Sequence, residues 1–346
     1  MVFLVQAFRR TIAISVTSAA IALSPLLSVV AQAQALSGAG ATFPAPLYER
    51  YFSEFQDETG IQVDYQAIGS GGGVRQVIAG TVDFGGSDAA MTDAQIEQVD
   101  GGVILVPTAG GAVAIVYNLP GVSELRLPRS VYPAIFAGQI TRWNDPRIAE
   151  ANPGVELPDL PIRTVVRADG SGTTFIFTNH LSAVDPYFRG RVGVGTAPRW
   201  TTNPIQGRGN PGVAAQVART QGAIGYVEYA YSKQNNLSAA LVENGNGEFI
   251  APSLETTEQA LSSVEFPDNF RVFVEDSDEG YPIAGLTWMI VYRQYDDAET
   301  AAAVRQLVEW VLTDGQEINN QLDYTRIPEE VAQEAISQVN EALGSN

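Results

Sequence analysis

The sequence predicts an α/β fold, because segments with the pattern of strands alternate with segments that have the pattern of helices. Three short loops of glycine with serine or threonine, at 38–44, 69–74 and 170–175, each run directly into a predicted helix. Ligands of open α/β sheets bind at the carboxyl ends of strands, which is where these loops fall. The 346 residues are enough for two domains with well-buried cores.

Apolar and β-branched runs predict the strands, and apolar residues three and four positions apart predict the helices. The predicted strands cover residues 62–67, 81–84, 102–107, 112–117, 162–167 and 226–231. Helices are predicted at 74–79, from 175 onward, at 304–312 and at 328–343. The stretch 182–212 is rich in Arg, Gly and Pro and is predicted to be a surface loop.

Two glycine-containing stretches, 107–111 and 281–285, are predicted to be crossings between two lobes. A paired crossing would return the C-terminal part of the chain to the lobe that the N-terminal part forms. Lobe I then consists of residues 36–108 and 283–346, and lobe II of residues 109–282. The alternative is that both stretches are ordinary turns.

The first 35 residues have the pattern of a secretory signal peptide. Two arginines form a basic start, an apolar run follows over 11–30, and cleavage after Ala33 or Ala35 fits the preference for small residues. We therefore expect export and removal of residues 1–35. The alternative is a retained membrane anchor.

The chain is strongly acidic, with a formal net charge of −19 and a single lysine, Lys233. Such a charge disfavours binding to nucleic acid or to anionic membranes. There is no cysteine, which excludes disulfides, thiol catalysis and thiolate metal sites. An anion site in this chain must therefore work through local hydrogen bonds, against the field of the whole protein.

Each of the three glycine-rich loops is a candidate oxyanion site. Glycine lets the backbone approach a ligand closely, and the first turn of a helix leaves N–H groups unpaired with a partial positive charge. A serine or threonine adds a hydroxyl donor. If the three loops converge, the protein would bind a small tetrahedral anion. None of the loops ends in the Lys-Ser/Thr pair of a P-loop, so a nucleoside triphosphate is disfavoured.

The third loop and the end of the strand before it combine several groups suited to an oxyanion. Arg167 offers a planar fork of donors, and Asp169 could hold that fork in place. Ser171, the N–H of Gly172 and Thr173 would bind the same anion from the start of the helix. The alternative is a strand–turn–helix junction with an N-cap and a surface ion pair.

Asp88 follows a glycine pair and suggests a specific use for a carboxylate beside an anion. Hydrogen phosphate can donate its proton to a carboxylate, whereas sulfate at neutral pH has no proton to donate. A site built to pair a substrate hydroxyl can reject an analogue without it by about 10⁴ to 10⁵. The alternative is that Asp88 is a turn or N-cap residue.

Signals of catalysis are weak in this chain, and we expect no catalytic residue, no metal and no cofactor. There is no Gly-x-Ser-x-Gly elbow, and His180 is the only histidine, expected to be an ordinary helix residue. No cluster of histidine and aspartate suggests a metallophosphatase. One alternative is a phosphatase or phosphotransferase with Ser171 or Thr173 as nucleophile. Another is a sensor or scaffold that holds phosphate as a structural ion.

Five motifs, in order along the chain, resemble those of the periplasmic phosphate-binding proteins of high-affinity ABC phosphate importers. They lie at residues 38–46, 68–70, 82–88, 167–173 and 222–231. The resemblance extends from about Leu36 to the C-terminal helical segment. It differs at Gly71, where relatives often have a second serine, and it is loose over 182–210.

The resemblance implies a type II periplasmic-binding-protein fold, with two lobes hinged about a cleft that closes on one dehydrated phosphate. It implies a phosphate ligand set of Thr42, Phe43, Ser70, Asp88, Arg167, Ser171, Gly172 and Thr173, with Asp169 supporting Arg167. It also implies a periplasmic protein, expected to be a monomer, that delivers phosphate to the membrane permease subunits of an ABC importer. The alternative anions are sulfate, molybdate and arsenate, and Asp88 argues against those that are fully deprotonated.

Overall fold

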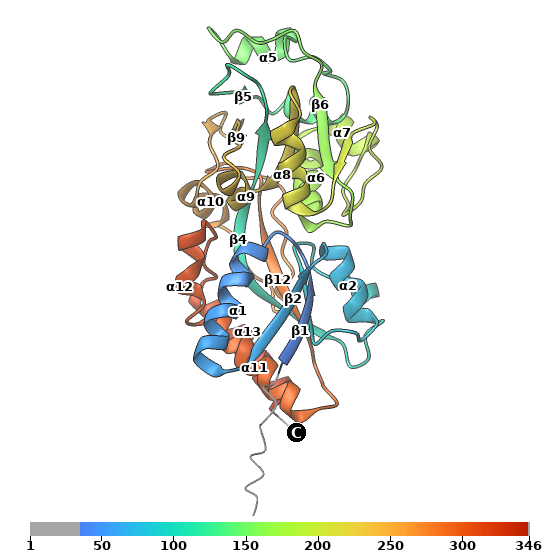
Figure 1. Ribbon diagram of the computed structural model, residues 1–346, viewed down its shortest axis with the longest axis vertical. Helices are drawn as coiled ribbons and strands as arrows, with labels where there is room; N and C mark the ends of the chain where they lie inside the picture. The colour runs from blue at the N-terminus through green and yellow to red at the C-terminus, as the bar shows by residue number, and fades with distance from the viewer. Residues whose placement is uncertain (1–34, 345–346) are drawn as a thin grey trace, which may run out of the picture. The chain divides into compact units, whose positions relative to one another are not determined.

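A nine-stranded sheet runs through the part of the chain that the computed structural model describes, residues 35–344 (Figure 1). The predicted signal peptide lies outside these residues, except for Ala35, which begins the first strand. The strands of the sheet are β1 (Ala35–Gly40), β2 (Gln62–Ala67), β3 (Phe84–Ser87), β4 (Val103–Tyr117), β6 (Arg163–Arg167), β7 (Ile205–Gly207), β8 (Ala223–Glu228), β9 (Ser238–Ala239) and β12 (Ala284–Tyr292).

A second, three-stranded sheet and a set of helices complete the architecture. The small sheet contains β5 (Arg126–Leu127), β10 (Leu241–Glu243) and β11 (Phe249–Ile250). The helices are α1 (Ala45–Thr59), α2 (Ser70–Ile78), α3 (Asp93–Ile96), α4 (Tyr132–Phe136), α5 (Pro146–Ala151), α6 (Gly172–Val184), α7 (Pro186–Arg191), α8 (Gly209–Arg219), α9 (Tyr229–Gln234), α10 (Leu254–Leu261), α11 (Ala298–Leu312), α12 (Gln316–Asn319), the 3₁₀ helix η1 (Asn320–Leu322) and α13 (Glu329–Leu343).

The long strand β4 connects two groups of strands within the large sheet. The strand order is β2-β1-β3-β12-β4-β8-β6-β7, with β9 also paired to β4. Up to Ala112, β4 pairs antiparallel with β12, and from Val113 onward it pairs antiparallel with β8. The strands β1, β2 and β3 are parallel to one another, and so are β6, β7 and β8. All 15 positions of β4 are buried, as expected for a strand covered on both faces.

The two glycine-containing stretches predicted as crossings lie side by side, because Gly111 of β4 is paired with Gly285 of β12. The alternative of two ordinary turns is wrong. These glycines make room for neighbours, since a Cβ on Gly111 would lie 2.8 Å from the ring of Phe43, and one on Gly285 would lie 2.6 Å from Ile176. The separate strands predicted at 102–107 and 112–117 are therefore one continuous strand. The lobe boundaries at 36–108 with 283–346, and 109–282, stay a prediction.

Several predicted element boundaries are shifted in the structure. The strand predicted at 81–84 is β3, which begins at Phe84 and continues through Gly85 and Gly86. These glycines belong to the strand and not to a turn, because α2 packs closely on it: a Cβ on Gly85 would overlap Val77 of α2. Helices α2 and α6 begin three or four residues earlier than predicted, inside their glycine-rich loops. The predicted loop at 182–212 is wrong, since it contains α7, β7 and the start of α8. The segment predicted as a strand at 226–231 is β8 only as far as Glu228 and then becomes α9.

The interior is built from two clusters of buried apolar residues. The larger one includes the aromatic side chains of α1, β12 and α11, such as Tyr48, Phe52 and Trp310. The smaller one packs α8 against the second half of β4 and against β6 and β8, through Val116 and Val213 among others. This packing holds the parallel strands of each group in register and fixes the positions of the loops at their carboxyl ends.

Candidate functional site

The residues predicted to bind an anion lie where strands end and helices begin. Thr42 lies between β1 and α1, Ser70 begins α2, and Asp88 directly follows β3. Arg167 is the last residue of β6, and Ser171 is the N-cap of α6. The side chains of all five are at least nine-tenths buried.

The three glycine-rich loops converge, which is the condition for binding one small tetrahedral anion between them. The N–H of Gly69 donates to the carbonyl of Gly40 (2.8 Å), and the N–H of Gly71 donates to the carbonyl of Gly170 (2.9 Å). These two hydrogen bonds join the second loop to the first and to the third. The loops therefore enclose one polar site at the carboxyl ends of β1, β3 and β6.

Ser70 links Asp88 to the start of α6. Its hydroxyl accepts hydrogen bonds from the N–H groups of Gly172 (3.0 Å) and Asp88 (3.3 Å), and it donates a longer one to Oδ2 of Asp88 (3.4 Å). The carboxylate thus lies against the N-terminus of α6, where the partial positive charge of the helix favours an anion.

Arg167 has the partner that the sequence predicted, Asp169, and a second one that it did not, the hydroxyl of Thr173. Its Nε donates to Oδ1 of Asp169 (3.0 Å), its Nη2 to Oδ2 of the same carboxylate (2.5 Å), and its Nη1 to the hydroxyl of Thr173 (3.2 Å). Burial raises the pKa of Asp169, but the hydrogen bonds and charge of Arg167 outweigh it, so the net pKa is below its ordinary value. The guanidinium has five N–H groups, so two remain for a ligand.

The backbone of Thr42 and Phe43 supplies two further donors. Both residues are buried, and neither N–H has a hydrogen-bond acceptor within residues 35–344. Buried backbone N–H groups are nearly always paired, so two together point to an external acceptor. The ring of Phe43 packs edge-on against Tyr324, whose hydroxyl donates to the Phe43 carbonyl (2.7 Å) and holds this turn in place.

Two polar groups of Ser171, its hydroxyl oxygen and its backbone N–H, form hydrogen bonds within the protein. Its hydroxyl oxygen caps α6 by accepting the N–H of Thr174 (3.0 Å), and its own N–H donates to the carbonyl of Thr196 (2.9 Å). The hydrogen of the Ser171 hydroxyl is therefore the one donor of this residue that is available to an anion. The predicted N-cap and the predicted ligand role are compatible, because they use different atoms of the same hydroxyl.

Asp88 is the one carboxylate that faces the converging donors. Burial raises its pKa to about 7, while hydrogen bonds from Thr287, Ser70 and the backbone of Thr173, and the charge of Arg167, act in the opposite direction. A carboxyl group with such a pKa exchanges its proton near neutral pH. It can share one proton with an acidic anion such as hydrogen phosphate.

Thr287 is a partner of this site that the sequence reasoning missed. Its hydroxyl donates to Oδ1 of Asp88 (2.9 Å), at the irregularity between Thr287 and Trp288 in the pairing of β12 with β4. The only signal in the sequence is a single threonine within a mostly apolar strand. Nothing along the chain relates that position to Asp88, which is 199 residues away.

Asn210 was missed because it falls in the stretch predicted to be a surface loop. It is fully buried near the start of α8, and its side-chain amide lies between the hydroxyls of Thr42 and Thr173. It therefore bridges the first and third glycine-rich loops. A short helix that begins with Gly209-Asn210-Pro211 carries too weak a pattern to place this side chain in advance.

His180 is remote from this chemistry. It is a buried residue of α6 whose Nε2 is bonded to the hydroxyl of Tyr132 (2.8 Å) and whose Nδ1 is bonded to the carbonyl of Glu275 (3.1 Å). Burial lowers its pKa to about 4, so it is neutral at pH 7. Neither Ser171 nor Thr173 is bonded to it, and within residues 35–344 no histidine is placed to activate either hydroxyl.

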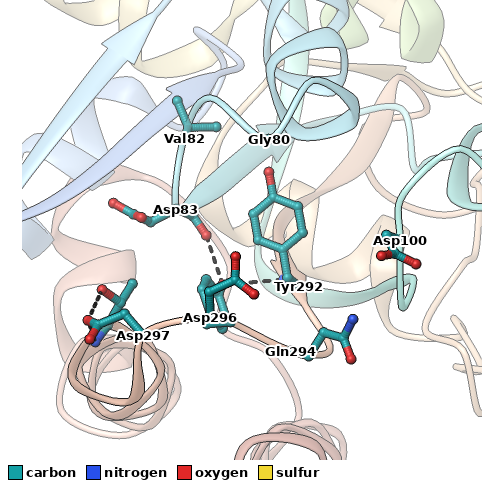
Figure 2. A pocket seen from close by; sticks show the side chains of 10 residues that line it. Gly80, Val82, Asp83, Asp100, Tyr292, Gln294, Asp296 and Asp297 are labelled. Carbon is teal, nitrogen blue, oxygen red and sulfur yellow. Dashed lines mark hydrogen bonds between the residues drawn. The ribbon is translucent and has the colours of Figure 1, made fainter.

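A separate pocket lies at the opposite end of β3 and β12 and is lined by acidic residues (Figure 2). Asp83 precedes β3 there, whereas Asp88 follows it, and Asp100, Asp296 and Asp297 lie around the same hollow. None of the predicted anion ligands lines this pocket. Four carboxylates make it unsuited to an anion.

Over residues 35–344, no group of three or more His, Cys, Asp or Glu side chains is arranged to hold a metal ion. In the same part of the chain, no helix has the length and apolar character needed to cross a membrane.

Comparison with known proteins identifies the relatives of this chain. A family model described as a PBP superfamily domain matches residues 28–315. The phosphate-binding protein PstS of Pasteurella multocida is 39% identical over 331 residues, which cover 93% of this chain and 95% of the relative. Its counterpart in Haemophilus influenzae is 38% identical over 314 residues, covering 89% and 93%.

Solved structures share the fold at lower sequence identity. A phosphate-binding protein from Stenotrophomonas maltophilia matches with a TM-score of 0.72 at 20% identity, covering 88% of this chain and 94% of its own. PfluDING, a high-affinity periplasmic phosphate-binding protein solved with phosphate bound, matches with a TM-score of 0.73 at 22% identity, covering 87% and 92%. At these identities the structures establish the fold alone.

The fold and the family model make this chain a member of the PBP superfamily. Its similarity to the curated relatives shows further that it belongs to the family of phosphate-binding proteins named PstS. The resemblance read from five motifs is thus confirmed, as is the α/β periplasmic-binding-protein fold. The curated relatives are named as phosphate-binding proteins, so the expectation of a binding protein is confirmed for the family.

Proposed function

We propose that this chain captures one inorganic phosphate ion at the converging loops and delivers it to the permease subunits of an ABC importer. One observation carries the proposal: hydroxyl, N–H and guanidinium groups from three glycine-rich loops converge beside the buried carboxyl group of Asp88, while the other carboxylate of the site, Asp169, is paired with Arg167. The proposed ligands are Thr42, Phe43, Ser70, Asp88, Arg167, Ser171, Gly172 and Thr173, with Asp169 holding Arg167. The N–H of Gly172 and the hydroxyl of Ser70 are bonded within the protein, so phosphate must replace the bond from Gly172 to Ser70 and the bond from Ser70 to Asp88 for these two groups to bind it.

The balance of donors and acceptors favours phosphate over other oxyanions. A site of donors alone would accept sulfate equally well. Asp88 and a bound oxyanion repel each other unless a proton lies between them. Hydrogen phosphate brings such a proton, whereas sulfate can bind only when Asp88 itself is protonated. An unshared negative charge in a buried site is costly, so sulfate at neutral pH is disfavoured. A dissociation constant of about 1 μM corresponds to about −8 kcal/mol, which a set of charge-assisted hydrogen bonds can supply.

The proposed transport step is binding and release, with no chemistry on phosphorus. Lobes I and II would close on phosphate by a hinge motion about the paired strands β4 and β12 and so create the surface that the transporter recognises. Export to the periplasm is supported by the N-terminal signal pattern and by a structural relative described as periplasmic. We expect the mature protein to act as a monomer.

Isothermal titration of the mature, phosphate-stripped protein with phosphate and then sulfate at neutral pH tests the proposal. We expect tight one-to-one binding of phosphate and much weaker binding of sulfate. Absence of phosphate binding, or equal binding of both anions, would overturn it. Delivery is tested by phosphate uptake in cells that lack their own receptor, where this chain should restore uptake only together with its permease.

A further inference from the structure

Asn210 makes four hydrogen bonds that tie the candidate site together. Its Nδ2 donates to the hydroxyl of Thr42 (3.0 Å) and to the hydroxyl of Thr173 (3.1 Å). Its backbone N–H, in the first turn of α8, also donates to the hydroxyl of Thr42 (3.1 Å). Its Oδ1 accepts the N–H of Glu228 (3.0 Å), which determines that the nitrogen end of the amide faces the hydroxyls.

The two threonine hydroxyls therefore receive hydrogen bonds and give none to the protein. Thr42 accepts two from Asn210, while Thr173 accepts one from Asn210 and one from Nη1 of Arg167 (3.2 Å). A hydroxyl has two lone pairs and one hydrogen, so the accepting capacity of both is filled. Neither hydrogen has an acceptor among the protein atoms of residues 35–344.

Such hydroxyls can interact with a ligand in only one way. Each can present its hydrogen to an acceptor, and neither can accept from a ligand that donates. A buried hydroxyl hydrogen without an acceptor is unfavourable, so the arrangement favours a ligand rich in acceptors, such as an oxyanion. Both hydroxyls come from the residues proposed to hold phosphate.

We propose that Asn210 is a positioning residue that makes the hydroxyls of Thr42 and Thr173 obligatory hydrogen-bond donors to the anion. The inference rests on the proposed function, since it concerns how that site selects its ligand. Asn210 acts through the two threonines. One amide group orients both hydroxyls: that of Thr42, which follows β1, and that of Thr173, in the first turn of α6.

The substitution Asn210→Asp reverses this arrangement with little change in shape. A carboxylate at this position would accept from both threonine hydroxyls and draw their hydrogens away from the anion. The charged groups next to it are Arg167, which also bonds to Thr173, and Asp169, which accepts the N–H of Gly209. The buried carboxyl group of Glu228 is also near, since the backbone N–H of that residue bonds to Asn210. Protonation of the new carboxyl at lower pH would restore a donor and reduce the added charge.

The test is titration of phosphate into the wild type and Asn210→Asp over a series of pH values from about 6 to 8, with thermal unfolding measured alongside. We expect the phosphate affinity of Asn210→Asp to be at least about 100-fold below that of the wild type at the upper pH. As the pH is lowered, the two affinities should become more similar. A purely structural role would lower the unfolding temperature and leave a pH-independent ratio of affinities.

Asn152→Asp is the matched control. Asn152 is also buried, and its Nδ2 donates to the carbonyls of Arg126 (2.9 Å) and Ile148 (2.8 Å), but it lies outside the candidate site. We expect it to lower the unfolding temperature and to leave phosphate affinity within about twofold of the wild type.

The outcomes separate this inference from the proposed function. No phosphate binding by the wild type would overturn both. Normal binding by the wild type, with a folded Asn210→Asp variant of unchanged affinity at every pH, would overturn the inference alone. If Asn210→Asp does not fold, Asn210→Ala decides: loss of both side-chain donors should weaken phosphate binding at least about tenfold, and an unchanged affinity would refute the positioning role.

Discussion

Gly172 lies so close to Asp88 that the chain has no room for a side chain there. A Cβ built on Gly172 would be 2.6 Å from Oδ2 of Asp88 and 2.7 Å from its Cα. Atoms at these distances overlap, and a backbone atom cannot swing aside as the end of a flexible side chain can. Glycine is therefore what lets the first turn of α6 approach the carboxylate.

We expect Gly172→Ala to abolish phosphate binding while the protein remains folded. The added methyl group would push α6 away from Asp88 and break the hydrogen bond from the Gly172 N–H to Ser70. Titration with phosphate and the thermal unfolding temperature give the two readouts. Gly190→Ala in α7 is the control, because a Cβ there meets nothing within 4 Å, and wild-type affinity in Gly172→Ala would contradict the close-contact argument.

Replacing the carboxylate should weaken the rejection of sulfate. Asp88→Asn removes the negative charge that an unprotonated anion would face, so we expect sulfate to bind measurably and to compete with phosphate. Asp83→Asn, at the other end of β3, keeps the site intact and should leave sulfate excluded. If Asp88→Asn still does not bind sulfate while it binds phosphate normally, Asp88 does not discriminate between the anions by their proton.

The wild type should itself begin to accept sulfate as the pH falls. Burial raises the pKa of Asp88 to about 7, so below that pH the carboxyl group is increasingly protonated and can donate to a sulfate oxygen. We therefore expect the apparent sulfate affinity to rise from pH 8 toward about pH 5. Titrations at constant ionic strength measure it. A sulfate affinity that does not change over this range would count against the assignment.

Loss of Arg167 should cost the site at least about 100-fold in phosphate affinity. Removing one partner of a buried ionic group is worth about 3–5 kcal/mol, because the remaining charges are left uncompensated. Arg167→Ala leaves Asp169 in that state beside the anion. Arg129→Ala is matched to it, because Arg129 also forms a forked pair, with Asp276, outside the site. Equal phosphate affinity in the two variants would exclude Arg167 from the ligand set.

Glu228 should make the unliganded protein less stable as the pH rises. Burial raises its pKa to about 8, although hydrogen bonds from Ala230 and Tyr324 act in the opposite direction. Its pKa in the unfolded chain is about 4.3, so the folded state holds the proton over a wider range and stability falls between these two values.

We therefore expect Glu228→Gln to flatten the decline in stability by an amount on the order of a few kcal/mol across that range. Urea unfolding at a series of pH values in phosphate-free buffer measures the effect. Glu317→Gln is a suitable comparison, because Glu317 is exposed and pairs with Arg326 at the surface. A decline as steep in Glu228→Gln as in the wild type would mean that another group titrates.

The parts of the site that could be predicted are those whose chemistry is local in the chain. Arg167, Asp169 and Thr173 lie within seven residues, and the structure joins them by direct hydrogen bonds. The glycine-rich loops could be predicted as well, since each glycine marks a close approach of the backbone. The predicted starts of α2, α6 and β3 were less accurate, because the sequence does not distinguish a glycine that packs between two elements from a glycine that forms a turn.

Thr287 and Asn210 could not be predicted, because their roles depend on residues far away along the chain. Thr287 contacts Asp88 across 199 residues, and Asn210 contacts Thr42 across 168. Neither has a local pattern that distinguishes a hydroxyl or an amide in the site from one elsewhere. Their placement follows from the packing of β12 beside β3 and of α8 against β6 and β8.

The sequence by itself determined the α/β class, the family and the kinds of donor that the site contains. These follow from local patterns, since a glycine loop before a helix, or an arginine two residues from an aspartate, has the same chemistry in any fold. Only the tertiary structure decided whether the hydrogen of each hydroxyl is available to a ligand and which carboxyl group carries a raised pKa. Those properties arise from burial and from partners that lie distant in the chain, and no local pattern can encode them.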